Sequence, residues 1–412
     1  HPADPAWIVH LPDGRSVTQW ADPERWRAEW RSHFPATGRF WRTQEMLADI
    51  SWDISSRPFP WPPQSAGDYL RLAQSLRPST MRALPYMTRT MADIAQVEDT
   101  MFRTFLDGQL LISAQATADQ ANALYGSAAL DLPRRGVNHV QGGIGSIAKT
   151  LAAWIIDHGG DVLYRQQVER IQPIANHRYI IQTKRGLELQ ADAVLANVTP
   201  WALRDLLGEA APKSLRREVD RLQPTWGAFT LYLGLDESIL PASAARHHQI
   251  IVDPYKPLGE GNSVFMSLSG PDDSSRAPEG RIAATLSTHT AVEPWWRLSE
   301  NGRGAYLERR ELYAERMLLA AEMALPGIRQ AVRLCLPGTP ITFDYFTRRP
   351  SGMVGGFPQT SLFKARGPRT GIPNLWLVGD SIFPGQSTAG VTLGAMRVAA
   401  DVLRANPAAA RG

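Results

Sequence analysis

The residues best suited to chemistry lie near the end of the chain, where Gly379 and Asp380 precede a loop and Gly390, Val391 and Thr392 open a helix. A carboxylate just after a strand lies where open α/β sheets bind their ligands, beyond the carboxyl ends of the strands. The first turn of the helix would add backbone N–H groups and the positive end of the helix dipole, which suit an anionic or electron-rich ligand. The stretch therefore predicts a ligand-binding site.

Two elements must position these residues. The apolar run Leu375–Val378, bounded by Pro373 and Gly379, predicts a short strand that is buried on both faces. Residues 394–403 place Met, Ala and Leu on one side and predict a helix. The loop between them is rich in Gly, Pro, Ser and Thr. The expected order is strand, acidic turn, flexible loop and helix N-terminus.

Two other interpretations of the same residues compete with a ligand site. Asp380 could be a helix cap or a turn residue, because most Gly-Asp-Ser triplets are turns. Ser381 could be the nucleophile of a Gly-Asp-Ser-type esterase, but such a serine needs a base within reach. No histidine follows Ser381, since the last one is His289. The esterase interpretation is therefore poor.

The carboxy-terminal stretch resembles the signature of the carotenoid desaturase and isomerase flavoproteins, the relatives of bacterial phytoene desaturase. The hydrophobic strand, Gly-Asp, Phe-Pro-Gly and Gly-Val-Thr-Leu carry the resemblance because they occur together in register. The resemblance implies FAD as the cofactor. In the family, the aspartate contacts the ribitol and pyrophosphate and the Gly-Val-Thr lies against the flavin. The matching positions here are Gly379, Asp380, Gly390, Val391 and Thr392.

The resemblance extends over most of the chain. Val168 matches the residue whose backbone meets the FAD adenine, although sequence alone favours a plain strand residue there. Residues 105–115 and 123–133 are similar to a subgroup, the C-3′,4′ desaturases of acyclic carotenoid ends, including 1′-hydroxy ends. The implied reaction removes two hydrogens from adjacent carbons of a C40 polyene, with hydride transfer to the flavin. A carotenoid cis–trans isomerase or ketolase of the same family, or a non-enzymatic carotenoid or lipid carrier, remains an alternative.

The same resemblance predicts the fold class. We expect an α/β fold with a Rossmann-like FAD-binding domain (residues 135–205 and 367–412) and a discontinuous α+β substrate domain of mixed sheet and helices (residues 1–134 and 206–366). No G-x-G-x-x-G follows a strand at the start of the chain. The FAD-binding domain is therefore expected to be incomplete at its amino end by a βαβ unit of about 30 or more residues. FAD binding by this chain alone is then an open question.

Several local expectations concern the middle of the chain. The patterns of Gly136–Gly142 and Asp161–Arg165 predict strands. His139, on the first of these, is a candidate catalytic base, although a structural histidine is the favoured interpretation. His247 and His248 are expected in a loop without partners at metal-ligand spacing, so no metal site is predicted.

Two groups of apolar side chains have competing interpretations. Trp26, Trp30 and Phe34 fall on one helix face beside arginines, and core packing is favoured over a lipid interface. Residues 68–115 are mostly helical in pattern, and their methionines could line an apolar tunnel. Methionine at helical spacing is more often simple core. The methionines concerned are Met81, Met87, Met91 and Met101.

Length and composition limit which classes of protein this chain can belong to. A chain of 412 residues with a hydrophobic fraction of 43% can form two domains with substantial cores. Its net charge of +4 comes from mixed acidic and basic residues, which gives nucleic-acid binding little support. Cys335 is the only cysteine, so no intrachain disulfide is possible. Because a C40 hydrocarbon resides in lipid, we expect a cytoplasmic enzyme that associates peripherally with the membrane surface; protein partners are unknown.

Overall fold

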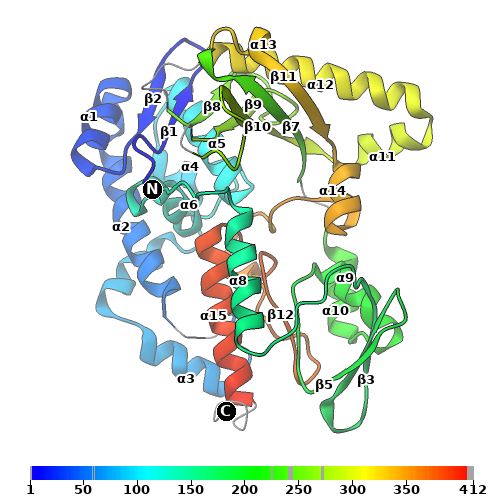
Figure 1. Cartoon of the computed structure of the whole chain (residues 1–412). Coiled ribbons are helices and arrows are strands. Elements are labelled where there is room, and N and C mark those ends of the chain that lie inside the picture. The colour runs from blue at the N-terminus through cyan, green and yellow to red at the C-terminus, as the bar shows by residue number, and fades with distance from the viewer. Residues whose placement is uncertain are drawn as a thin grey trace.

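The structure, a computed structural model, describes residues 2–57, 59, 61–223, 226–239, 245–270 and 273–405. A seven-stranded mixed sheet, a group of helices beside it and a smaller group of short sheets and helices make up the described chain (Figure 1). The large sheet has the strand order β11-β7-β10-β9-β8-β1-β2. Its strands are β1 (Trp7–His10), β2 (Ser16–Gln19), β7 (Trp226–Asp236), β8 (His247–Ile251), β9 (Ser263–Leu268), β10 (Arg281–Ala291) and β11 (Val332–Gly338).

The large sheet combines two strands from the start of the chain, within residues 7–19, with five strands from residues 226–338. β1 pairs parallel with β8, with Val9 opposite Gln249, while the other neighbours are antiparallel. Burial alternates along β10, as expected when one face of a sheet packs on a core. The helix α12 (Arg303–Ala324) covers that face with Tyr313, Met317 and Ala320. The expected mixed sheet is confirmed.

A group of helices packs on the opposite end of the sheet and holds an aromatic core. These helices are α1 (Pro23–His33), α2 (Gly38–Ser55), α3 (Ala66–Ser75), η2 (Pro78–Tyr86), α4 (Met91–Ala95), α5 (Thr100–Ala114), α6 (Ala123–Leu130) and α7 (Leu132–Arg135). Trp30 and Phe34 are buried against Phe102 and Phe105, so the core interpretation of the aromatic stripe is confirmed. The methionines divide, because Met91 is core, Met87 lines a cavity and Met81 is exposed.

The smaller group contains the strand that precedes Asp380. It has a three-stranded antiparallel sheet of β3 (Val168–Pro173), β4 (Tyr179–Thr183) and β5 (Glu188–Ala191), and a parallel pair of β6 (Val194–Ala196) and β12 (Leu375–Leu377). All of β12 is buried, as the sequence predicts. The helices are α8 (Gly145–Asp157), α9 (Pro200–Leu207), α10 (Lys213–Arg221) and α15 (Thr388–Ala405). The remaining helices are α11 (Glu293–Glu300), α13 (Ile328–Ala331) and α14 (Pro340–Thr347).

Two predicted strands are wrong. Gly136–Gly142 forms only an isolated bridge between Asn138 and Pro2, because glycines with positive φ turn the chain at both ends of the segment. Asp161–Arg165 is irregular, and Arg165 itself has a φ of 59°, a left-handed conformation that ends an extended strand. In both segments the residue pattern suits a strand, but a regular pairing partner is missing among the described residues.

The expected loop at His247 and His248 is also wrong. Both residues begin β8, and each ring contacts a second histidine; the two pairs, His10–His248 and His139–His247, are together called the histidine row here. His10 Nε2 lies 3.0 Å from His248 Nδ1, and the His247 ring stacks on the ring of His139 at 4.8 Å. Burial lowers the pKa of His10 and of His247 to about 4. A smaller contribution comes from neighbouring groups that are positive when protonated, which for His10 is His248. The row is therefore neutral at pH 7 and joins β1, β8 and the segment around His139.

The histidine row predicts a loss of stability in acid. The pKa of His10 and of His247 is lower in the folded chain than the 6.5 of the free side chain, so below pH 6.5 the unfolded chain binds protons that the folded chain does not. Stability is thus fully present above pH 6.5 and falls as the pH drops from 6.5 toward 4. We expect His10→Gln to reduce this slope, by up to about 1.4 kcal/mol per pH unit, in urea titrations at several pH values.

The control for this prediction is His158→Gln, because His158 is exposed on the end of α8. This variant should keep the parent slope. An unchanged slope in His10→Gln would show that the row does not carry the acid sensitivity.

Candidate active site

A tight turn at the end of β12 places Asp380. Gly379 has a φ of +108°, and a Cβ on this residue would lie 2.4 Å from Oδ1 of Asn197. Only glycine therefore permits this turn without displacing Asn197, because other residues are strained at this φ and the added carbon would clash. Asp380 then follows directly beyond the carboxyl end of β12, as predicted.

The Asp380 carboxylate is held by an arginine. Arg349 Nη1 donates to its two oxygens at 3.2 and 2.9 Å, and Arg349 Nη2 donates to the carbonyl of Gly355 at 2.5 Å. The side chains of Arg349 and Asp380 are 25% and 23% exposed, so both are partly shielded from water. This pair gives the site a fixed acceptor beside a fixed positive charge. Asp380 lies in a turn, as one interpretation of the sequence expects, and its carboxylate also binds an arginine 31 residues away in the chain.

Asp380 lines a cleft of about 1100 Å³. The cleft is also lined by Gln115, which is buried and has a φ of 56°, and whose Nε2 lies 3.2 Å from Nε2 of His289. The Gln115 amide oxygen is buried and has no hydrogen-bond partner among the residues that the structure describes. Burial lowers the pKa of His289 to about 4, so this ring is neutral at pH 7. Other lining residues are Glu218, Arg221, Trp226, Phe357, Arg366 and Ser381.

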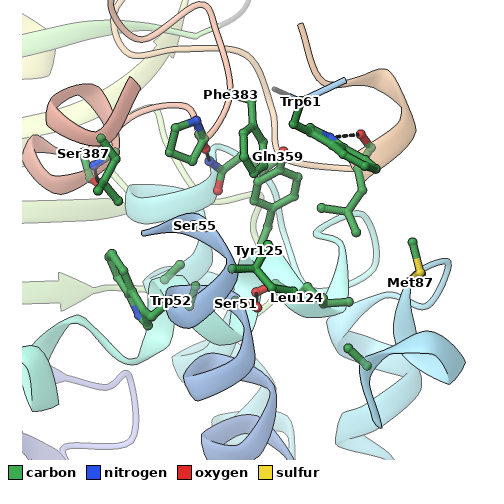
Figure 2. A pocket seen from close by; sticks show the side chains of 18 of the residues that line it. Ser51, Trp52, Ser55, Trp61, Met87, Leu124, Tyr125, Gln359, Phe383 and Ser387 are labelled. Carbon is green, nitrogen blue, oxygen red and sulfur yellow. Dashed lines mark hydrogen bonds between the residues drawn. The ribbon is translucent and has the colours of Figure 1, made fainter. Parts of the chain in front are cut away.

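An apolar cavity of about 290 Å³ adjoins the cleft (Figure 2). Its walls come from α2, the η2 segment, α6 and the loop before α15, and no described residue that lines it is charged. Four residues line both the cavity and the cleft, so the two spaces meet there. These residues are Tyr125, Gln359, Phe383 and Pro384.

Tyr125 marks the junction of the two spaces. In Figure 2 its side chain points toward Phe383, and the two ring centroids lie 6.3 Å apart. Burial raises the pKa of the Tyr125 phenol, an effect that the nearby Arg397 opposes only in part. The hydroxyl therefore stays protonated and can donate a hydrogen bond at the inner end of the cavity.

The helix after the loop begins at Thr388, two residues before Gly390, where the sequence pattern predicts the helix to open. Ser387, with a φ of 90°, caps it by accepting from the amide of Gly390 at 3.0 Å, and Val391 donates to the Ser387 carbonyl at 2.9 Å. The amides of Gly390 and Val391 are thus used within the helix. In the described chain, the N–H groups of Thr388 and Ala389 are the ones left for a ligand.

The remaining predicted site residues have different positions. Gly390 lines the apolar cavity, Val391 is half-buried and Thr392 is exposed, with its hydroxyl bonded to the Thr388 carbonyl. Val168 begins β3, packs against the same core as β12 and lines neither space. The role of Val168 stays a prediction. His139 also lines neither space and stacks on His247 instead.

The sequence reasoning missed Arg349 and Tyr125. Arg349 lies 31 residues before Asp380 in an ordinary Arg-Arg-Pro stretch, so no local signal pointed to it. Tyr125 lies within a segment that carried the family resemblance, which is a signal of position but not of role. In the part of the chain that the structure describes, no group of three or more His, Cys, Asp or Glu side chains has the arrangement of a metal site.

The residues around the cleft fit a dinucleotide such as FAD. Asp380 lines the cleft and offers an acceptor for ribityl hydroxyls, and Arg221 and Arg366 in the cleft wall offer positive charge for a pyrophosphate. Arg349 and the start of α15 do not line the cleft themselves, but Arg349 is bonded to Asp380 and α15 follows the lining residue Gly385 closely. The Gln115 amide oxygen, which has no partner among the described residues, adds a buried acceptor to the cleft lining. The cleft of about 1100 Å³ is slightly larger than the usual range of ligand sites, about 300–1,000 Å³, and so has room for a large ligand.

Comparison with known proteins gives relatives over almost the whole chain, although no family model matches it. The chain is 28% identical to prolycopene isomerase of Daucus carota, over 97% of this chain and 67% of that protein. It is 23% identical to the neurosporene-forming phytoene desaturase of Rhodobacter capsulatus, over 95% of this chain and 76% of that protein. Putrescine oxidase has a similar fold, with a TM-score of 0.59 at 13% identity over 97% of this chain and 81% of that chain. The predicted fold class is confirmed.

The ion pair at the cleft predicts a specific stability loss. Asp380→Ala leaves the guanidinium of Arg349 partly buried without its carboxylate, which should cost about 1–3 kcal/mol of unfolding free energy. Chemical denaturation measures this cost. The control is Asp192→Ala, which removes the partner of Arg178 where the carboxylate is 80% exposed, and should cost less than about 1 kcal/mol. Equal losses in the two variants would contradict the structural role of the Asp380 pair.

Proposed function

Because this chain belongs to the family of carotenoid desaturases and isomerases, we propose that it is an FAD-dependent oxidoreductase that desaturates the C-3′,4′ position of an acyclic carotenoid end. The observation that carries the proposal is the uncharged cavity that meets the Asp380 cleft at Tyr125 and Phe383. A polyene has no charged group for a protein to bind, so an uncharged wall is the complementary surface.

The size of the cavity supports a reaction at one end of the chain. Ligand sites for drug-sized molecules span about 300–1,000 Å³, and this cavity has about 290 Å³. A C40 polyene is larger than such a molecule, so only an end section fits. The inner end of that section would lie beside Tyr125 and the cleft. Its outer part would remain outside the cavity.

The chain supplies binding and orientation to this reaction. A bound FAD supplies the hydride acceptor. Asp380, Arg349 and the start of α15 would hold the cofactor, with Gly379, Gly390, Val391 and Thr392 shaping the loop around it. The apolar walls exclude water from the reacting carbons. The Tyr125 hydroxyl can fix a polar end group by donating a hydrogen bond.

Cis–trans isomerisation is the second candidate, and the comparisons favour it. Prolycopene isomerase of Daucus carota is more similar to this chain than the Rhodobacter capsulatus desaturase, at 28% against 23% identity over comparable lengths. An isomerase needs the same apolar cavity, since its substrate is also a long polyene. The two reactions differ in whether the product loses hydrogen.

The proposal includes a place at the cytoplasmic membrane surface, where the substrate resides. No helix among the described residues combines the length and the apolarity that crossing a bilayer requires. Attachment at the surface would let the protein take a lipid-soluble substrate without a membrane span.

Product analysis distinguishes the two candidate reactions. The protein is expressed in a host that accumulates an acyclic 1-hydroxy-carotenoid, and the pigments are separated and weighed by mass spectrometry. Desaturation lengthens the conjugated system, so we expect a product that has lost two hydrogens and absorbs further to the red. A product of unchanged mass and altered retention supports isomerisation. Unchanged pigment with this substrate and with cis-lycopene would overturn both candidates.

Cofactor binding has a test that does not depend on activity. Asp380→Asn keeps the shape of the side chain but removes the charge, so the purified variant should retain flavin about tenfold less tightly than the parent. Flavin absorbance and release on dialysis measure this. The matched control is Asp205→Asn on the exposed side of α9, which should retain flavin like the parent. Equal retention by all three proteins would show that Asp380 does not contact the cofactor.

A further inference from the structure

The segment 66–86, which contains α3 and η2 and is called the α3–η2 lobe here, exposes unusually many apolar side chains. A surface helix normally buries its apolar face. In α3, however, the one buried residue is the polar Asp68, while Tyr69 and Leu70 are 61% and 59% exposed. In Figure 1, α3 lies at the outer edge of the molecule. The apolar face of α3 is therefore available to a partner.

The exposed apolar surface continues from α3 onto η2. Leu76, at the end of α3, is 48% exposed, and Met81 and Leu84 on η2 are 57% and 51% exposed. Clustered exposure of this kind marks an interaction site, because isolated apolar residues are common on surfaces but contiguous groups are not.

The charges of the lobe have one sign. Its arginines are Arg71, Arg77 and Arg82, and Arg89 follows shortly after it. Asp68 is the only acidic residue between positions 66 and 89, and it is fully buried in ion pairs with Arg71 and Arg369. The side chain of Arg77 is 64% exposed but forms an ion pair with Asp53 of α2, so the exposed Arg82 and Arg89 contribute most of the positive charge. Apolar side chains beside exposed arginines complement a bilayer with anionic headgroups.

The lobe also forms the mouth of the apolar cavity. Leu72, Leu76 and Leu84 line the cavity, and two of them, Leu76 and Leu84, are about half exposed to solvent. The same side chains thus face the cavity and the outer surface. A molecule that leaves a bilayer beneath the lobe would reach the cavity without crossing water.

We propose that the α3–η2 lobe docks on an anionic lipid bilayer and is the portal through which a polyene end enters the cavity. The portal half of this proposal rests on the proposed function, whereas the docking half does not. The cavity holds only one end of a C40 chain, so the remainder of the substrate stays in the bilayer while the end reacts.

A second exposed apolar face gives the matched control. On α8, Leu151 is 59% exposed, the same as Leu70 on the lobe. The α8 helix carries one positive and one negative side chain, Lys149 and Asp157, and no α8 residue lines either described space. Exposure alone therefore does not distinguish the faces. The α3–η2 lobe differs from α8 in its excess of positive charge and in its position at the mouth of the cavity.

The experiment measures cosedimentation of the purified protein with vesicles of phosphatidylcholine containing one third phosphatidylglycerol. Substitution Arg82→Gln removes one exposed charge and should weaken binding about fivefold, the equivalent of about 1 kcal/mol. Leu70→Ser removes an inserting side chain and should weaken binding about tenfold. Leu151→Ser should bind like the parent. Thermal unfolding should be unchanged in all three variants, because each residue is exposed.

The outcomes separate docking from catalysis. Weaker binding of both lobe variants with normal binding of Leu151→Ser supports the proposal. Equal binding by all variants, or no binding of the parent to these vesicles, overturns the proposal. A concentration-dependent dimer that Leu70→Ser abolishes also overturns it, because the lobe would then contact a second copy of the chain instead of lipid. For the portal, Leu70→Ser should lose turnover of vesicle-borne carotenoid yet keep turnover of detergent-dispersed carotenoid; equal loss in both overturns it. Vesicle binding without turnover of any carotenoid counts against the proposed function and leaves docking intact.

Discussion

The site depends on the ion pair between Arg349 and Asp380. Arg349 follows α14, where the chain leaves the large sheet, and Asp380 follows the buried strand β12. The pair therefore ties the two halves of the molecule together at the rim of the cleft. Removing one partner of a partly buried pair costs more than the pair contributes, because the remaining charge loses its hydrogen bonds. This constraint fixes where a ligand hydroxyl can meet a carboxylate.

Polar and apolar recognition lie side by side around this pair. Charged side chains, among them Glu218, Arg366 and Asp380, line the cleft, while none of the described residues that line the adjoining cavity is charged, and the two spaces meet at Tyr125 and Phe383. This arrangement suits a reaction between a polar cofactor and a hydrocarbon, because the cofactor would lie against polar residues and the hydrocarbon against apolar ones. The exposed lobe at the cavity mouth extends the same principle outward. Apolar surface continues from the cavity through Leu76 and Leu84 to the outside.

Local sequence patterns determined the elements whose physics is local. The buried strand β12 follows from a short apolar run between Pro373 and Gly379, and the aromatic face of α1 follows from helical spacing. Glycine at position 379 was recognisable in a turn, and the structure gives it a φ of +108°. The fold class and the place of Asp380 after its strand could thus be predicted. The division of the chain into four domain segments stays a prediction.

Tertiary structure decided what depends on residues far apart in the chain. Strand pairing made His247 part of β8 and denied a regular strand to Gly136–Gly142, since a strand exists only with a partner. The Arg349–Asp380 pair and the contact of Tyr125 with Phe383 join positions with no shared local pattern. Sequence by itself determined the short buried strand before Asp380 and the types of the side chains that follow it, because side-chain type and periodicity are local properties. Only the folded chain decided which side chains meet, because their proximity depends on how distant segments pack.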